Sequence, residues 1–342
     1  MKQYREATHS VLPMLKGQLI VSTQSGISLV EVMIALVLSL MLAIGTTQLF
    51  ISNKTSYKTS ESISRIQENA RYAMQRIGAD LSAGGYMGCV PNAGAETITN
   101  TLGLNATAVN NFLLAIDATA ADSFTIRKAG AGSSIPLTAS MPNQTSPIQL
   151  DNADPDYAQL QQYQILTVGD CSHASVFMIS NDPTTSGGTI EHQTAVSAPA
   201  GAINPGQFNS SEDLGARYGS ELDSVATSFS TITSTYSIGD STAAIQAGNT
   251  CNNGANPSFC ALLQNGTELV EGVQGLTLLF GVDGDGDLVA ENYVNNAAVT
   301  NWDNVISVRV TLNMNSVQPM PDGNLMTKGI SNTFRLRNRA MR

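Results

Sequence analysis

Charged residues are scarce in this chain. Asp, Glu, Lys and Arg make up only 13% of its 342 residues, whereas its middle is rich in Ser, Thr, Asn, Gly and Ala. This composition is unlike that of a cytosolic enzyme and is common in exported, β-rich surface proteins. The length allows one large domain or two small ones.

Motifs of the common enzyme classes are also missing. The sequence has no G-x-x-x-x-G-K-[ST], which excludes a P-loop ATPase, and it has neither H-E-x-x-H nor G-x-S-x-G. Of the three histidines, His9 lies near the N-terminus, and His173 and His192 are expected on the surface or in loops. We therefore expect that the chain is not an enzyme.

Positive charge is limited as well, and the formal net charge is −10. Residues 1–26 carry a net charge of +2, so the remainder carries −12. So acidic a surface repels phosphate backbones, and nonspecific nucleic-acid binding is not expected. Only "RLRNRAMR" at the C-terminus could form a basic patch.

One long apolar run is present, from Ile27 to Ile51, with Glu31 as its single charge. At about 1.5 Å per residue, it reaches across a hydrocarbon core of about 30 Å. The basic residues before it predict a cytoplasmic N-terminus and export of the remainder. An ordinary secretory signal is the alternative, but "TTQLFISNK" after the run offers no A-x-A site. The better small-residue junction is Gly26, before the run.

The helical pattern continues beyond this run. Apolar residues recur in steps of three and four, as in an amphipathic helix, at Ile63, Ile66, Ala70, Ala73, Met74, Ile77 and Leu81. The positions between them are polar: Arg65, Glu68, Arg71, Gln75, Arg76 and Asp80. No Pro interrupts residues 27–85, which predicts one helix that ends at "SAGGYMGC". The alternative is two helices with a break near Asn53.

The sequence after this helix predicts β-strands joined by polar segments. Candidate strands are 123–129, 163–169, 175–180, 275–282 and 304–314. The last has the clearest alternation, which would bury Ile306, Val308, Val310, Leu312 and Met314 and expose the residues between them. Residues 181–260 have weak periodicity and predict long loops.

All four cysteines follow the apolar run: Cys89, Cys171, Cys251 and Cys260. An even number in an exported domain suggests two disulfides, with three possible pairings. We favour Cys89–Cys171 and Cys251–Cys260, the second closing the loop "CNNGANPSFC". A metal site is less favoured, because Cys171-Ser172-His173 has no C-x-x-C partner.

Several segments resemble a known family. "GISLVEVMIAL" resembles the class III signal of type IV pilins, with a Gly before the cleavage site and a Glu at the fifth mature position. Other segments resemble the PilW family of minor pilins: "RIQENARYAMQRIGADLSAGGYMGC", "ELVEGVQGLTLLFGVDGDGD", "WDNVISVRVTL" and the terminal "LRNR". They lie in this order and span the chain from residue 25.

The resemblance implies an α+β chain with the type IV pilin fold. A prepilin leader would occupy residues 1–26, and the N-terminal helix would have a transmembrane half at 27–51 and an amphipathic half at 52–85. Residues 86–342 would form a periplasmic or extracellular β-rich globular domain. The amphipathic half would pack on its antiparallel sheet, and long loops would join the strands.

The resemblance also assigns roles to the opening residues. A prepilin peptidase is expected to cut between Gly26 and Ile27 and to methylate Ile27. Glu31 would then pair with a cationic N-terminus, its own or that of an adjacent subunit, because an unpaired carboxylate near hydrocarbon is costly. In the alternative interpretation, Glu31 reaches the lipid headgroups, since it lies only one turn inside the run.

The implied function is that of a minor pilin. It would help to initiate type IV pilus assembly at the bacterial inner membrane and lie at or near the pilus tip, supporting adhesion, twitching motility or DNA uptake. Its partners would be other minor pilins, the major pilin and the inner-membrane assembly platform, with a large tip adhesin as a further candidate. The chain would cross the membrane once and later form part of the fibre at the cell surface.

Two features depart from the family pattern. The leader is long if translation starts at Met1, and Met14 would give a more ordinary length. Major pilins usually have a helix-breaking Pro near the position of Gln48, and its absence here favours a specialised subunit over the bulk filament subunit.

The acidic segment "VDGDGDLVAENY" is a separate candidate site. Asp283, Asp285 and Asp287 alternate with other residues, and Glu291 follows, so these carboxylates could converge on Ca²⁺. The segment is not an EF-hand, because Leu288 replaces the required Gly and Val294 replaces the bidentate acid. The alternative is a solvated turn between two strands, since Asp-Gly pairs favour turns.

Two other functions remain open. The chain could be a tip module that itself binds a surface, DNA or a large tip adhesin through the loops at 181–260, although the acidic charge counts against DNA. It could also be a J-type pseudopilin of type II secretion. Deletion phenotypes would separate an assembly role from a binding role, and neighbouring genes would identify the secretion alternative.

Overall fold

The computed structural model describes residues 26, 28–88, 90, 98–103, 115–120, 122–219, 226–252 and 254–338. The chain divides into two compact units, residues 1–56 and 57–342. Helix α1 (Leu29–Ala83) contributes residues to both.

Helix α1 is one helix, as predicted, with no break near Asn53. In the first unit, its large apolar side chains from Leu29 to Ile51 are exposed. Hydroxyl groups in this segment donate to carbonyls one turn back, for example Ser39 Oγ to Ala35 O at 2.7 Å, so they need no other partner in an apolar surrounding. Within the described part of the chain, α1 is the one helix long and apolar enough to cross a membrane.

The helix ends at the glycines that the sequence indicated. Gly84 N donates to Leu81 O at 3.1 Å, and Tyr86 N donates to Ala83 O at 3.1 Å. Gly85 has a φ of +73°, a left-handed conformation that glycine adopts without the strain a Cβ would bring. These bonds satisfy carbonyls that the last turn would otherwise leave without a partner.

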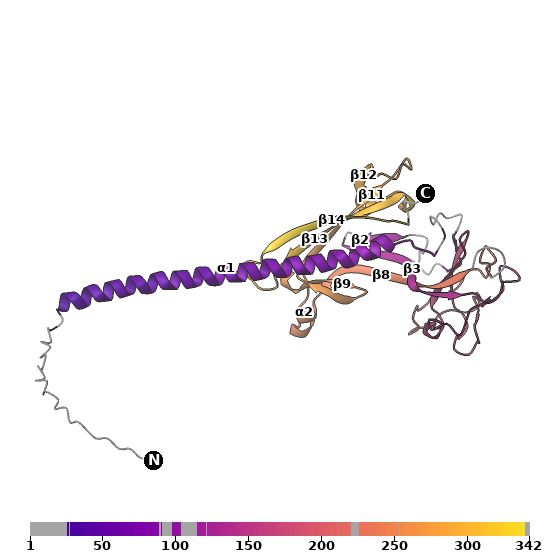
Figure 1. Cartoon of the computed structure of the whole chain (residues 1–342), viewed down its shortest axis with the longest axis horizontal. Helices are drawn as coiled ribbons and strands as arrows, with labels where there is room; N and C mark the ends of the chain where they lie inside the picture. The colour runs from indigo at the N-terminus through magenta and orange to yellow at the C-terminus, as the bar shows by residue number, and fades with distance from the viewer. Residues whose placement is uncertain are drawn as a thin grey trace, which may run out of the picture. The chain divides into compact units, whose positions relative to one another are not determined.

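Two sheets of the second unit enclose the C-terminal part of α1 (Figure 1). The larger sheet has the order β1-β6-β5-β8-β3-β2, and β9 joins β8 and carries β10. Its strands are β1 (Ile98–Asn100), β2 (Ile116–Ala120), β3 (Ser123–Pro136), β5 (Ile165–Gly169), β6 (Ala174–Met178), β8 (Thr227–Asp240), β9 (Cys260–Gln264) and β10 (Thr267–Glu271).

The second sheet has the order β12-β11-β13-β14 and is antiparallel throughout. Its strands are β11 (Val273–Val282), β12 (Asn292–Val294), β13 (Val305–Asn315) and β14 (Thr327–Arg335). Two short strands, β4 (Ile148–Gln149) and β7 (Thr189–Ile190), pair with each other. The other helices among the described residues are α2 (Thr242–Ala247) and four 3₁₀ turns at Tyr157–Gln159, Pro257–Phe259, Asn296–Ala298 and Trp302–Asn304.

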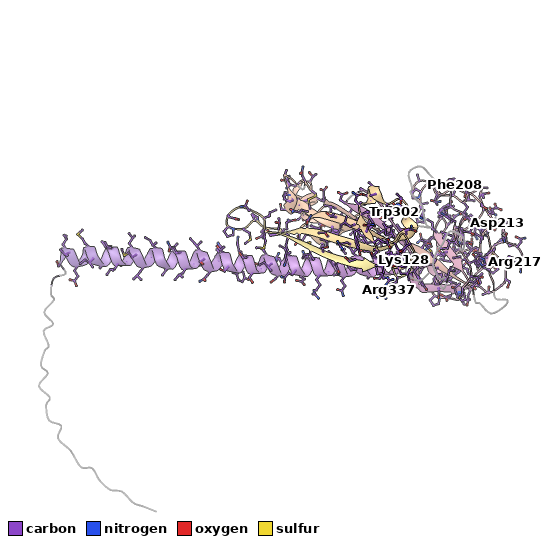
Figure 2. All side chains as sticks on the ribbon, turned by 90° about the horizontal axis from the view of Figure 1, so that it is seen from above. Lys128, Phe208, Asp213, Arg217, Trp302 and Arg337 are labelled. Atoms are coloured by element: carbon purple, nitrogen blue, oxygen red, sulfur yellow. A yellow bond between two sulfur atoms is a disulfide. The ribbon has the colours of Figure 1, made fainter. Side chains whose placement is uncertain are left out.

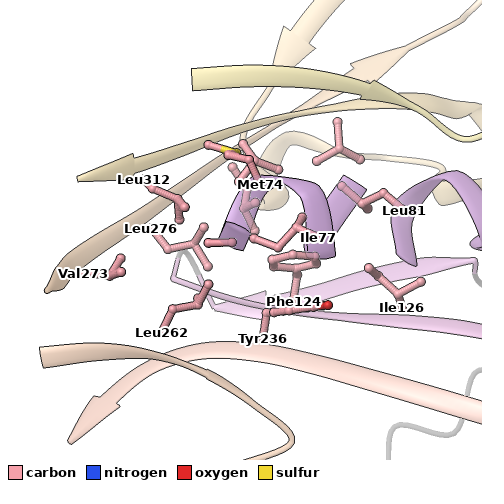
Figure 3. Close-up of a cluster of buried hydrophobic side chains, with 14 of the residues drawn as sticks. Met74, Ile77, Leu81, Phe124, Ile126, Tyr236, Leu262, Val273, Leu276 and Leu312 are labelled. Atoms are coloured by element: carbon pink, nitrogen blue, oxygen red, sulfur yellow. The ribbon is translucent and has the colours of Figure 1, made fainter. Parts of the chain in front are cut away.

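The main core lies between these sheets and the apolar face of α1. Figure 3 shows Met74, Ile77 and Leu81 of the helix facing apolar side chains of both sheets, among them Phe124, Tyr236, Leu262, Leu276 and Leu312. The predicted apolar row is buried from Ile66 onward, but Ile63 is 37% exposed. The prediction for Ile63 was wrong, because this residue lies one turn before the part of α1 that the sheets cover.

Two expectations about the β region need correction. Residues 181–260 are not loops throughout, because β8 runs through the middle of the larger sheet. That sheet is also not purely antiparallel, since β1 pairs with β6 in parallel. The loop prediction is confirmed for much of residues 191–219.

The alternation predicted for β13 holds only in part. Val308, Val310, Leu312 and Met314 are buried, and Asn313 is exposed. Val305 and Ser307, however, are also buried. Val305 belongs to the main core, and Tyr293 Oη lies 3.1 Å from Ser307 Oγ, so neither position faces solvent.

Candidate functional site

The first candidate site is the start of helix α1. Gly26 is exposed, and a Cβ added there would meet nothing within 4 Å. Ile27, the expected methylation site, lies outside the described residues. Glu31 is exposed in the first turn, where a carboxylate is favourably placed in the field of the helix. It forms no ion pair with any residue that the structure describes.

The second candidate site is the loop between β11 and β12, where the four predicted carboxylates come together. Each residue offers an oxygen, and these oxygens all lie within 4.8 Å of one another: Asp283, Asp285, Asp287 and Glu291. Asp283 is 3% exposed, and the other three are exposed. The sequence-based grouping therefore corresponds to a real cluster at one end of the second sheet.

Hydrogen bonds within this loop hold the carboxylates in place. Asp283 accepts from Gly286 N at 2.6 Å and from Leu288 N at 3.0 Å, and Glu291 Oε2 accepts from Gly284 N at 2.8 Å. Such bonds are those of a closed polar turn, which agrees with the turn interpretation. The carboxylates keep further lone pairs, so the donor set also suits a hard cation that takes several oxygen ligands.

The cysteines are placed as follows. Cys251 and Cys260 form a disulfide with a Cα–Cα distance of 4.6 Å, which agrees with the favoured pairing. Cys171 is also disulfide-bonded. Its predicted partner, Cys89, lies outside the described residues.

A buried ion pair that the sequence did not predict joins α1 to the larger sheet. Asp80 was placed on the polar face of the helix but is 2% exposed. Its carboxylate lies 2.9 Å from Lys128 Nζ on β3 and accepts from Tyr236 Oη at 2.7 Å and from Gln264 Nε2 at 3.1 Å. The one available signal was a Lys within the strand pattern "SFTIRKA".

The electrostatics of this group follow from its surroundings. Burial alone would raise the pKa of Asp80, but hydrogen bonds from Lys128 and Tyr236 and the charge of Lys128 outweigh it and lower the pKa below its usual 3.8. Burial and the hydrogen bond to Asp80 raise the pKa of Tyr236. The carboxylate is therefore ionised and fully bonded, as expected of an anchor rather than a proton donor.

His192, expected on the surface or in a loop, lies in a loop but is buried. It is 3% exposed, and its ring centroid lies 5.4 Å from that of Phe177. Nε2 lies 3.0 Å from Ser146 O, and burial lowers the pKa of the ring. These contacts are those of a neutral core histidine.

Comparison with known proteins now adds to this geometry. The model of the family described as type IV pilus-assembly protein W (PilW) matches residues 235–332. The matched segment begins in β8, includes the acidic loop and ends within β14. No curated protein and no solved structure shows a significant match.

The match supports a role in type IV pilus assembly, and the matched family is one of assembly proteins rather than enzymes. Such a family suggests a location in the cell envelope, and helix α1 could anchor the chain in a membrane. Over residues 235–332, the match bears out the resemblance to the PilW family that the sequence motifs indicated.

Proposed function

We propose that this chain is a minor pilin that helps to initiate type IV pilus assembly from the inner membrane and lies at or near the pilus tip. The match of residues 235–332 to the PilW family carries the proposal. A long helix with an exposed apolar segment, followed by a β-rich unit, supports it. Deletion of the gene is expected to abolish surface pili, counted by electron microscopy.

The proposed maturation step is cleavage of the peptide bond between Gly26 and Ile27, followed by methylation of the new amine. The exposed Gly26, next to the start of α1, is consistent with access by a peptidase. Mass spectrometry of the chain from cells with and without prepilin peptidase tests this step. We expect the chain to lose residues 1–26 only in cells that contain the peptidase. The same precursor mass in both kinds of cell would contradict cleavage.

The proposed role of Glu31 is to pair with the cationic N-terminus of this subunit or of a neighbour. Its exposure and its lack of an ion pair within the described residues support this role. The cost of an unpaired carboxylate near hydrocarbon, several kcal/mol, would favour one stagger between helices. The headgroup interpretation predicts instead that a Glu31→Gln variant assembles normally.

A binding role at the tip is the second candidate function. The observation that favours it is the long loop region at 191–219, since loops on a rigid scaffold are common binding sites. A deletion strain that has normal numbers of pili but no longer attaches to surfaces would support the binding role rather than the assembly role. A type II secretion pseudopilin is distinguished by its gene neighbours.

We extend the proposal to the acidic loop as a Ca²⁺ site, on the observation that four carboxylates offer oxygens within 4.8 Å of one another. The turn interpretation explains the same hydrogen bonds without a cation. Calorimetric titration of the full chain in detergent separates the two. A heat of Ca²⁺ binding that the wild-type chain gives and the Asp285→Asn, Asp287→Asn double variant does not would support the Ca²⁺ site. No heat from the wild-type chain at millimolar Ca²⁺ would support the turn interpretation.

A further inference from the structure

Strand β14 forms one edge of the second sheet. It pairs with β13 from Ser307↔Arg335 to Asn315↔Thr327, and no other described strand pairs with it. Seven of its nine residues are exposed, and only Ile330 and Phe334 are partly covered. A strand of this length with one open side can accept a further strand.

The direction of the open backbone groups follows from the ladder. Leu336 N donates to Ile306 O at 2.8 Å, so this residue points its backbone groups toward β13. Because these groups alternate along an antiparallel strand, those of Gly329, Ser331 and Thr333 point away from β13. Consistently, Thr333 N donates to the side chain of Asn332 at 2.9 Å rather than to another strand.

A groove runs beside this edge, between β14 and helix α1. It is lined on the helix by residues that include Arg71, Gln75 and Gly78, and on the strand side by Asn332 and Phe334. Arg337 also lines it, near the C-terminal end of α1 (Figure 2). An added strand would therefore place its side chains between the sheet and the helix.

Charge distinguishes the C-terminal segment that forms this edge from the segment before it. Every charged residue between Arg217 and Arg309 is an acid, whereas Asp322 is the only acid from Arg309 to residue 338. Lys328 and Arg335 lie on β14, and Arg337 follows it. Arg335 Nη2 already donates to Leu288 O at 3.3 Å, and Arg309 Nε of β13 donates to Thr333 Oγ1 at 3.4 Å. Lys328, Arg337 and Arg71 form no ion pair with the described residues.

We infer that the open edge of β14 binds an extended, carboxylate-bearing segment of another pilus subunit, which pairs with Gly329, Ser331 and Thr333 and is held by Lys328, Arg71 and Arg337. The identity of the partner as a pilus subunit rests on the proposed function. The backbone pairing supplies affinity without sequence preference, and the cations select an acidic segment.

A second copy of this chain fits the edge less well. Two β14 edges paired with each other would bring two sets of the same cations together, and like charges across an interface are costly. The charge of the edge therefore favours a different polypeptide with acidic residues in an extended segment.

The experiment is site-specific photo-crosslinking of the full chain in piliated cells. A photoreactive residue replaces Thr333 at the edge, and in a matched control it replaces Thr277, which is exposed on β11 of the same sheet. We expect an adduct from position 333 and not from 277, with the captured peptide identified by mass spectrometry as an acidic segment of another pilus subunit.

Variants of the edge make the test specific. Ser331→Pro removes one outward N–H and leaves the β13 bonds of the neighbouring residues, whereas Ser331→Ala removes only the bond from Thr311 Oγ1 at 3.0 Å. We expect the adduct yield to fall about tenfold with Ser331→Pro and to stay unchanged with Ser331→Ala. Lys328→Glu with Arg337→Glu leaves the backbone intact and is expected to lower the yield as well.

Other outcomes overturn the inference. These are the absence of an adduct at position 333, capture of a second copy of this chain or of a basic segment, and equal yield with Ser331→Pro and Ser331→Ala. If deletion removes all pili and position 333 gives no adduct, the edge inference fails and the proposed function stands. If deletion leaves normal pili, the proposed function fails, whatever the crosslinking shows.

Discussion

At the scale of single residues, Asp80 is a buried polar group that joins helix α1 to the larger sheet. It is buried on a helix face that otherwise packs apolar side chains, and three groups from three strands bind its carboxylate. A buried pair of this kind adds little over an apolar contact of the same shape, but breaking it leaves an uncompensated charge.

An Asp80→Ala variant should therefore be clearly destabilised, because Lys128 would keep its charge at a largely covered position. We expect a loss of about 3 kcal/mol in the free energy of unfolding, measured by urea denaturation of the full chain in detergent. Glu68→Ala, at an exposed position of the same helix, is the control and should unfold close to the wild-type midpoint. An unchanged midpoint for Asp80→Ala would contradict the anchoring role.

The same carboxylate predicts a pH dependence. Since its pKa is lowered in the folded state, the unfolded chain binds the proton more readily, and the stabilisation is complete above pH 3.8. It is lost as the pH falls below 3.8 and through the lowered pKa. Urea midpoints of wild type and Asp80→Asn should therefore converge on acidification below pH 3.8. A constant difference at all pH values would show that Asp80 does not supply this dependence.

Single residues also mark where the sequence was insufficient. The helical spacing correctly predicted that Ile66, Ala70, Met74, Ile77 and Leu81 are buried. It could not predict that Asp80 is buried, because its partners Lys128 and Tyr236 lie far away along the chain. The four carboxylates of the acidic loop were predictable because they are close together in sequence, and local hydrogen bonds bring them together.

At the scale of elements, helix α1 and strand β13 were predictable and β8 was not. Strand β8 is rich in Ser and Thr, and its polar side chains pair across the sheet, as in Thr125 with Thr235 at 3.0 Å and Thr167 with Thr231 at 2.9 Å. A central strand can be stabilised by such hydroxyl pairs, which leave no hydrophobic alternation in the sequence. Its partners β3, β5 and β9 are separated from it in sequence, so pairing was not visible either.

The contact between α1 and β14 gives a prediction for these elements. A Cβ at Gly78 would overlap the ring of Phe334, so Gly78→Ala must push that ring off the helix. We expect a loss of about 1–3 kcal/mol in the free energy of unfolding, measured by urea denaturation in detergent. Gly45→Ala in the same helix is the matched control, because a Cβ there meets nothing within 4 Å. A loss for Gly45→Ala equal to that for Gly78→Ala would show that the Phe334 contact is not the cause.

At the scale of the whole molecule, the two units differ in whether the apolar side chains of α1 are exposed or buried. The first exposes them along α1 from Leu29 to Ile51, and the second buries them around α1 from Ile66 to Leu81. This difference was predictable because each half of the helix carries its own pattern, continuous in one and periodic in the other. The sheet order was not predictable, since it depends on contacts between distant segments.

The docking charge gives a prediction for the assembled fibre. In a strain whose only copy of this chain carries Glu31→Gln, pilus numbers should fall about tenfold or more, because the subunit would lose the charge that we propose fixes its stagger. Glu61→Gln, an exposed acid in the second unit that pairs with Arg65, is the matched control and should leave pili unchanged. Immunoblots should show equal amounts of both variants in the membrane.

The most direct test of the central claim is a count of surface pili in a strain that lacks this chain. Electron micrographs should show few or no pili in the deletion strain and normal numbers after complementation with the wild-type chain. Normal pilus numbers in the deletion strain would contradict a role in the initiation of type IV pilus assembly.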